Sequence, residues 1–200
     1  IMQVRALVEA ESWSKLFGLI PRLYRTDAKY DITLNLTLMR AGKARYEDED
    51  YLNSLLLYRM VLPRDVLLGY TDSKIDRLQK KLNSDKRIGI IETEVQKRQA
   101  EIDGLASSKQ VLVELPAYED EVTFRIGQIY AEIKRFWEGF VLFDKLYQQD
   151  RTSEIGEAAM LQSVLVLYDV KEIKRAEERI LTYLSEQPDG QYARTLLSLM

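Results

Sequence analysis

Residues 120–153 read DEVTFRIGQIYAEIKRFWEGFVLFDKLYQQDRTS, and this stretch decides the fold class. Its apolar residues recur every three or four positions, which predicts two helices joined by a short turn. Helix–turn–helix units of this kind repeat about every 34 residues in helical arrays. Residues 35–68 and 157–190 align with this stretch on the same template. The aligned positions carry Gly42, Ser54 and Tyr58, then Gly127, Gly139 and Phe143, then Val164, Ala176 and Ile180.

Small residues occupy the positions at which the two helices of each unit would cross. They are Gly42 and Gly127 on the first helix, with Ser54, Gly139 and Ala176 on the second. Two antiparallel helices approach closely only where no bulky side chain separates their backbones. The larger residue four positions further along would then fill the space between one hairpin and the next.

This pattern resembles the tetratricopeptide repeat (TPR) family, in which a large residue, leucine-glycine and an aromatic residue precede small, aromatic and small positions and a closing proline. The resemblance implies an all-α solenoid of antiparallel helix hairpins. Three positions depart from the family pattern: Pro63 comes early, Arg151 replaces the closing proline, and Val164 replaces the glycine. A non-repetitive helical bundle is the alternative interpretation.

The repeat array is interrupted. Gly42 and Gly127 are 85 residues apart, whereas adjacent repeats place this glycine about 34 residues apart. We therefore expect six segments. They are truncated repeat-like helices in 1–34, repeat one in 35–68, a helical hairpin insertion in 69–117, repeat two in 118–153, repeat three in 154–190, and a capping helix or the start of a further repeat in 191–200.

The insertion is rich in charged residues, and its periodicity predicts an antiparallel helical hairpin. A short arm carries Ile75, Leu78 and Leu82 and would end at the loop-like residues 83–85. A long arm, from about residue 87 to 115, would follow a coiled-coil heptad spacing. Its apolar seam is Ile88, Ile91, Val95, Ile102, Leu105 and Leu112, with Arg98 and Lys109 at two seam positions, and Gly89 and Gly104 weaken the arm. The hairpin either projects and binds a partner or a second copy through residues 70–116, or packs on the repeats.

The flanks also read as helical. Apolar residues at helical spacing fill residues 1–30, where Pro21 should kink or restart a helix. At the other end, Pro188-Asp189-Gly190 is a stop signal before a final apolar helix in 192–200. Both ends are apolar, whereas terminal solenoid repeats need a polar outer face. With no methionine at position 1, these ends suggest a fragment of a longer protein.

Composition excludes much chemistry. The chain has 46% hydrophobic residues and a net charge of −3, which indicates a packed protein without the basic face of a nucleic-acid binder. Because it has no cysteine and no histidine, it can form no disulfide, thiolate nucleophile, imidazole base or Cys/His zinc site. Charges interrupt every apolar stretch, so we expect no transmembrane segment. The compartment is not decided by these features.

No pattern of catalytic, cofactor or metal-ligating residues was found. The acidic run 47–50 lacks the alternating oxygen ligands and turn glycine of a calcium loop, and in the alignment it forms a solvated turn. Phosphate-binding Gly-Lys-Ser loops and Gly-x-Ser-x-Gly elbows do not occur. We therefore expect no enzyme activity, no cofactor and no metal.

Binding is the remaining expectation, and the TPR resemblance suggests where it occurs. The concave face of a solenoid comes from the first helix of each repeat. By resemblance, the groove would be lined by Leu36, Met39, Lys43 and Tyr46, then Glu121, Phe124, Gln128 and Glu132, then Ala158, Leu161, Leu165 and Tyr168. The carboxylate clamp of chaperone-binding members is not present. The alternative is that these side chains pack against neighbouring helices.

The resulting hypothesis is a non-catalytic protein–protein interaction scaffold that binds a protein or peptide segment in this groove. Two alternatives stay open: a structural or oligomerising module, and a regulatory domain fused to an enzyme outside this stretch.

Overall fold

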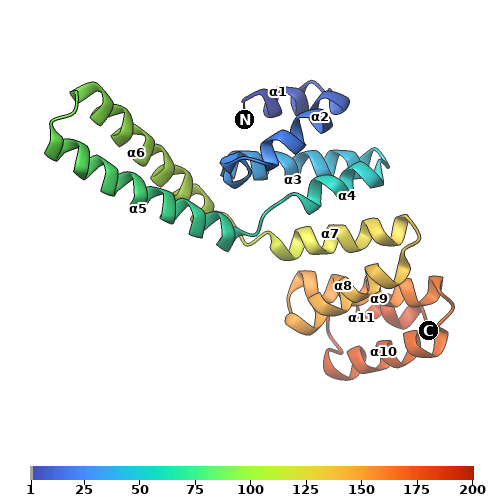
Figure 1. Ribbon diagram of the computed structural model, residues 1–200. Helices are drawn as coiled ribbons and strands as arrows, with labels where there is room; N and C mark the ends of the chain where they lie inside the picture. The colour runs from blue at the N-terminus through green and yellow to red at the C-terminus, as the bar shows by residue number, and fades with distance from the viewer. Residues whose placement is uncertain (1) are drawn as a thin grey trace. The chain divides into compact units, whose positions relative to one another are not determined.

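The computed structural model describes residues 2–200, which contain eleven α-helices, one 3-10 helix and no strand (Figure 1). The all-α class expected from the sequence is confirmed. The chain forms two compact units. Unit 1 is Ile1–Ala41 with Met60–Tyr118, and unit 2 is Gly42–Arg59 with Glu119–Met200. Helix α3 (Ile32–Glu47) begins in unit 1 and ends in unit 2.

Unit 1 begins with two short helices that pack on each other, α1 (Met2–Glu9) and α2 (Trp13–Tyr24). The 3-10 helix η1 (Asp27–Tyr30) packs on α2 and on α5 (Arg64–Ile88). The ring of Tyr30 stacks on that of Tyr70, with centroids 4.1 Å apart. Pro21 lies inside α2, so the expected restart of the helix at this proline does not occur.

The rest of unit 1 is the hairpin of α5 and α6 (Glu92–Glu114), whose arms have 25 and 23 residues. The expectation of one short and one long arm is therefore wrong, and residues 83–85 lie within α5. The chain turns instead at Gly89, whose φ of +74° is the left-handed conformation that glycine adopts easily. The N–H groups of Gly89 and Ile90 both donate to the carbonyl of Asp85. Gly89 is thus the C-cap of α5 and not a weak point inside a long arm.

The two arms of the hairpin pack through only part of the predicted seam. Ile102 and Leu112 of α6 are buried, as are Leu67 and Leu82 of α5. The two charged seam positions are paired across the hairpin. Arg98 forms an ion pair with Asp85, whose side chain is only 8% exposed, and Lys109 Nζ lies 2.6 Å from Asp72 Oδ1. This part of the seam therefore faces the other arm. The prediction that Ile88 and Ile91 belong to the seam is wrong, because they lie at the turn and are 74% and 73% exposed.

Unit 2 is a series of helices in which neighbours along the chain pack together. They are α4 (Tyr51–Arg59), α7 (Glu119–Glu132), α8 (Phe136–Gln149), α9 (Glu154–Asp169), α10 (Ile173–Glu186) and α11 (Ala193–Ser198). α7 packs on α4, α8 and α9. The main core lies under α9 and α10, where Met160, Val164, Ile180, Tyr183 and Leu196 are fully buried.

The same turn conformation joins four pairs of helices. Glu11, Glu49, Lys134 and Lys171 have φ between 50° and 63°, and they are the only non-glycine residues with positive φ among residues 2–200. In each turn this residue donates to the carbonyl three positions back, and the next residue donates to the carbonyl five positions back. This is the Schellman pattern of helix termination. Each turn ends one helix and starts the next within three residues.

These four turns predict an unusual stabilising substitution. A side chain in the left-handed region costs about 1 kcal/mol relative to glycine. Lys134→Gly should therefore raise the free energy of unfolding by about 0.5–1 kcal/mol, measured by urea denaturation. Lys145→Gly, in the exposed interior of α8, removes the same side chain and should lower it by about 1 kcal/mol. Equal effects of the two changes would contradict the turn geometry.

Small residues lie at the helix crossings of unit 2, as the sequence predicted. A Cβ atom added to Gly127 of α7 would lie 2.7 Å from the Phe143 ring, and one added to Gly139 of α8 would lie 2.9 Å from the Gly127 carbonyl oxygen. A Cβ on Gly42 would lie 3.1 Å from the Tyr58 ring. The Ser54 hydroxyl donates to the Gly42 carbonyl over 2.7 Å. These contacts leave no room for larger side chains.

Candidate functional site

Unit 2 contains a cavity of about 310 Å³ between α7 and α9. We call it the groove pocket, and its lining is Glu121, Phe124, Arg125, Glu154, Ile155, Ala158 and Tyr192. Three of these residues, Glu121, Phe124 and Ala158, belong to the groove predicted from the sequence. Tyr192 comes from the segment before α11, about seventy residues further along the chain than α7.

The groove pocket has an apolar wall and a charged edge. Phe124 packs edge-on against the buried Phe143 ring, with centroids 5.5 Å apart, and this contact fixes its side chain. Ile155 and Ala158 face it from the first turns of α9, which begins at the N-cap residue Ser153. Ser153 accepts a hydrogen bond from the N–H of Gly156 and so sets where α9 begins.

Two carboxylates and one guanidinium line the edge of the groove pocket. Arg125 Nη2 lies 3.9 Å from Glu121 Oε1, and Arg125 Nη1 donates to Gln128 Oε1 over 3.0 Å. Glu154 forms no ion pair with any of residues 2–200. Two carboxylates and one guanidinium give the edge a net negative charge, and the guanidinium of Arg125 is already engaged.

Charged residues of α7 also affect the pKa values of nearby tyrosines. Burial raises the pKa of Tyr58 to about 12; nearby Arg125 opposes the rise and Glu121 adds to it. Burial likewise raises the pKa of Tyr46, and the carboxylate of Glu132 adds to this effect. Both phenols are therefore neutral at physiological pH, Tyr58 as a buried ring and Tyr46 as a half-buried one.

The shifted pKa of Tyr58 predicts a loss of stability in alkali. A group whose folded-state pKa is raised stabilises the fold fully below its unfolded pKa of 10.0. For Tyr58 this contribution is lost as the pH rises from 10 to about 12, by about 2–3 kcal/mol in total. Urea denaturation at several pH values measures it. Tyr58→Phe should show a shallower alkaline decline than the wild type, and identical declines would refute the assignment.

The predicted groove residues do not all form one open surface. Leu161 and Tyr168 pack against the main core of unit 2, and the Tyr168 hydroxyl donates to the Leu199 carbonyl over 2.8 Å. The residues that follow α11 thus cover this part of α9. Leu165, also on α9, is 37% exposed. Phe124 is also partly core. For Leu161, Tyr168 and in part Phe124, the structure thus agrees with the alternative that predicted groove residues pack against neighbouring helices.

The remaining predicted residues come from α3, α7 and the turn after α3. Leu36, Met39 and Tyr46 are half-buried, and Lys43 is exposed and lies 3.9 Å from Glu47. Gln128 is half-buried beside Arg125, and Glu132 is exposed. Arg45 forms ion pairs with Asp48 and Asp50 of the acidic run 47–50.

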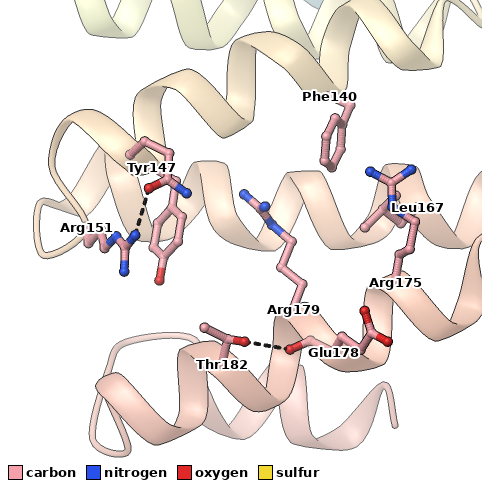
Figure 2. A pocket seen from close by; sticks show the side chains of 9 residues that line it. Phe140, Tyr147, Arg151, Leu167, Arg175, Glu178, Arg179 and Thr182 are labelled. Carbon is pink, nitrogen blue, oxygen red and sulfur yellow. Dashed lines mark hydrogen bonds between the residues drawn. The ribbon is translucent and has the colours of Figure 1, made fainter.

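A second cavity, of about 230 Å³, lies between α8 and α10 and was not predicted from the sequence (Figure 2). We call it the arginine pocket because Arg151, Arg175 and Arg179 line it. Figure 2 shows Arg179 extending between Phe140 and Tyr147. Its guanidinium carbon lies 5.4 Å from the centroid of each ring.

Most charges of the arginine pocket are satisfied within the protein. Arg179 donates to Ser163 of α9 over 2.8 Å and pairs with Asp144 of α8 over 2.6 Å. Arg151 pairs with Glu186 over 2.8 Å. Arg151 and Arg179 therefore connect α8, α9 and α10, and we interpret this pocket as a structural contact between these helices. The repeat alignment does not predict the arginine pocket, because its arginines lie outside the aligned positions.

Comparison of the chain with protein-family models, with curated proteins and with solved structures found no match. Among the helices described, none is both long and apolar enough to span a bilayer. Within residues 2–200, no group of three or more His, Cys, Asp or Glu side chains is placed to hold a metal ion.

Proposed function

We propose that this chain is a non-catalytic protein–protein interaction module of the tetratricopeptide type. It would bind a segment of a partner protein by inserting an apolar side chain into the groove pocket. The observation that carries this proposal is the pocket itself, which combines an aromatic and aliphatic wall with a charged edge. Buried apolar anchors surrounded by a polar rim are typical of peptide recognition.

The turn geometry supports the repeat part of the proposal. Gly42, Gly127 and Val164 each precede a left-handed turn residue by seven positions. Ser54, Gly139 and Ala176 each follow that turn residue by five positions. Three independently formed turns thus keep one register with the small crossing residues, which a non-repetitive bundle has no reason to do.

The first two helices extend this register. Glu11 has the same turn conformation, and the equivalent positions around it are Val4, Leu16 and Ile20, which are all buried. Helices α1 and α2 therefore fit a further repeat-like hairpin in which larger apolar residues replace the small ones. The departure suggests a wider helix crossing there than in unit 2.

The size and charge of the groove pocket indicate what it binds. At about 310 Å³, it has room for one large side chain and lies at the small end of the range for cofactor or drug-sized ligands. Glu121 and Glu154 lie at its edge, and Arg125 is engaged by Glu121 and Gln128. We expect a partner segment with an aliphatic or aromatic anchor flanked by lysine or arginine.

The hairpin seam favours the interaction module over an oligomerising module. Ile102 and Leu112 face α5, and the charged seam residues are paired within the hairpin. The buried part of the heptad seam is therefore occupied within the hairpin and is not open to a second copy. Self-association through residues 70–116 would have to use other surfaces.

Filling the groove pocket tests the proposal without removing any packed side chain. Peptides selected on the wild-type protein from a random phage-displayed library serve as the probe. Ala158→Phe should weaken peptide binding at least about tenfold by fluorescence anisotropy. Val141→Phe, on the exposed surface of α8, is the matched control and should bind within about twofold of the wild type. Equal binding by Ala158→Phe, with the wild-type melting temperature, would exclude the groove pocket.

A further inference from the structure

The turn of the α5–α6 hairpin carries three exposed isoleucines. Ile88, Ile90 and Ile91 are 74%, 40% and 73% exposed, and Gly89 lies between them. We call residues 79–99, which include this turn and the adjoining helix ends, the hairpin tip. A solvated turn of this kind needs only the left-handed glycine, and polar residues commonly fill its other positions. Adjacent exposed aliphatic residues instead indicate a surface that is covered in the working state.

Basic residues surround these isoleucines. The hairpin tip contains six basic and three acidic residues, a net charge of +3 in a chain whose net charge is −3. Asp85 and Glu94 are paired with Arg98 and Lys97 within the tip. Lys81, Lys86 and Arg87 form no ion pair with any of residues 2–200. Free positive charge therefore lies next to exposed apolar side chains.

We propose that the hairpin tip docks on the surface of an anionic lipid bilayer. The isoleucines would enter the boundary between head groups and acyl chains, and Lys81, Lys86 and Arg87 would contact anionic head groups. Apolar insertion combined with basic residues is the chemistry by which monotopic segments bind membranes. Ile88 lies about 36 Å along α5 from Arg64, so the base of the hairpin can stay outside the lipid.

Charge selects the bilayer over a second copy of this chain. Two hairpin tips that met through their isoleucines would bring two net charges of +3 together, which is unfavourable. The seam between the arms is already occupied within the hairpin, so it offers no alternative contact. An anionic bilayer satisfies the isoleucines and the basic residues at once, and it needs no preformed pocket to receive a convex turn.

Vesicle flotation tests this proposal. The probe is phosphatidylcholine vesicles with and without about 30 mol% phosphatidylserine. The wild type should bind the anionic vesicles, and about 0.5 M salt should weaken the binding. Ile88→Ser/Ile91→Ser and Lys86→Glu/Arg87→Glu should each lower the partition coefficient at least about tenfold. Leu52→Ser/Val141→Ser replaces two aliphatic residues that are 69% and 62% exposed elsewhere, and should leave it unchanged.

A spectroscopic readout locates the contact. Because the chain has no cysteine, Ile91→Cys can be labelled at one site with an environment-sensitive fluorophore. Its emission should shift to the blue on adding anionic vesicles, whereas the same label at Ser107→Cys, on an exposed position of α6, should not respond. Absence of vesicle binding by the wild type, or equal binding by all the variants, would overturn the proposal. Self-association that the isoleucine variant abolishes, without vesicle binding, would assign the tip to a second copy instead.

Discussion

Gly127→Leu is expected to lower the free energy of unfolding by about 3 kcal/mol, the upper part of the range for overpacked cores. A Cβ atom at this position would already lie 2.7 Å from the Phe143 ring, before the rest of the leucine is added. Phe143 is fully buried, and the carbonyl of Gly127 limits α8 at Gly139. The two helices α7 and α8 cannot move apart without opening the core that positions Phe124 in the groove pocket.

A second glycine in a helix provides the matched control. Gly104 lies within α6, and a Cβ there would meet nothing within 4 Å. Gly104→Leu should therefore stabilise the protein by about 1 kcal/mol, because leucine is the better helix former. Urea denaturation followed by circular dichroism measures both variants. An unchanged midpoint for Gly127→Leu would show that α7 and α8 do not cross at this residue.

Arg98→Ala should destabilise the hairpin by about 3–5 kcal/mol, because it leaves the buried carboxylate of Asp85 without its counter-charge. The Arg98 side chain is 17% exposed and that of Asp85 is 8% exposed, so water cannot replace the lost partner well. The loss should be local. Amide hydrogen exchange in residues 80–99 should accelerate by two orders of magnitude or more, whereas exchange in α9 and α10 should not change.

The preceding residue in the chain gives the control for that experiment. Lys97 pairs with Glu94 in solvent, with its side chain 73% exposed, so Lys97→Ala should leave the free energy of unfolding almost unchanged. Replacing both buried partners, Asp85→Leu/Arg98→Leu, should restore most of the lost stability. If Arg98→Ala and Lys97→Ala have equal effects, the ion pair does not hold the arms together.

The sequence was sufficient for the helices and their crossings, because small residues at fixed spacing leave few ways to pack. It was not sufficient for the hairpin turn. Residues 83–85 have the local character of a loop, but Asp85 pairs with Arg98 on the other arm and the segment stays helical. The heptad spacing places Gly89 inside a long arm, but its positive φ reverses the chain there. The left-handed residues of the four turns between helices, such as Lys134, are not glycines, so the sequence gives no signal of their conformation.

The candidate site was predicted only in part, for a related reason. Glu121, Phe124 and Ala158 followed from the repeat register, and the structure brings them to one pocket. Tyr192 joins them because the C-terminal segment folds back, and the same segment covers Tyr168 through the carbonyl of Leu199. Contacts between segments so distant along the chain leave no local periodicity that reasoning from spacing could detect.

Methyl NMR tests the proposed binding function most directly. In protein labelled at isoleucine and alanine methyl groups, titration with a library-selected peptide should shift the resonances of Ile155 and Ala158. The methyl group of Ile173, which is 42% exposed on α10, should not shift. Perturbations confined to Ile155, Ala158 and their neighbours are the predicted result. Shifts that leave Ile155 and Ala158 unchanged while the peptide binds would contradict the proposal that the groove pocket receives the partner.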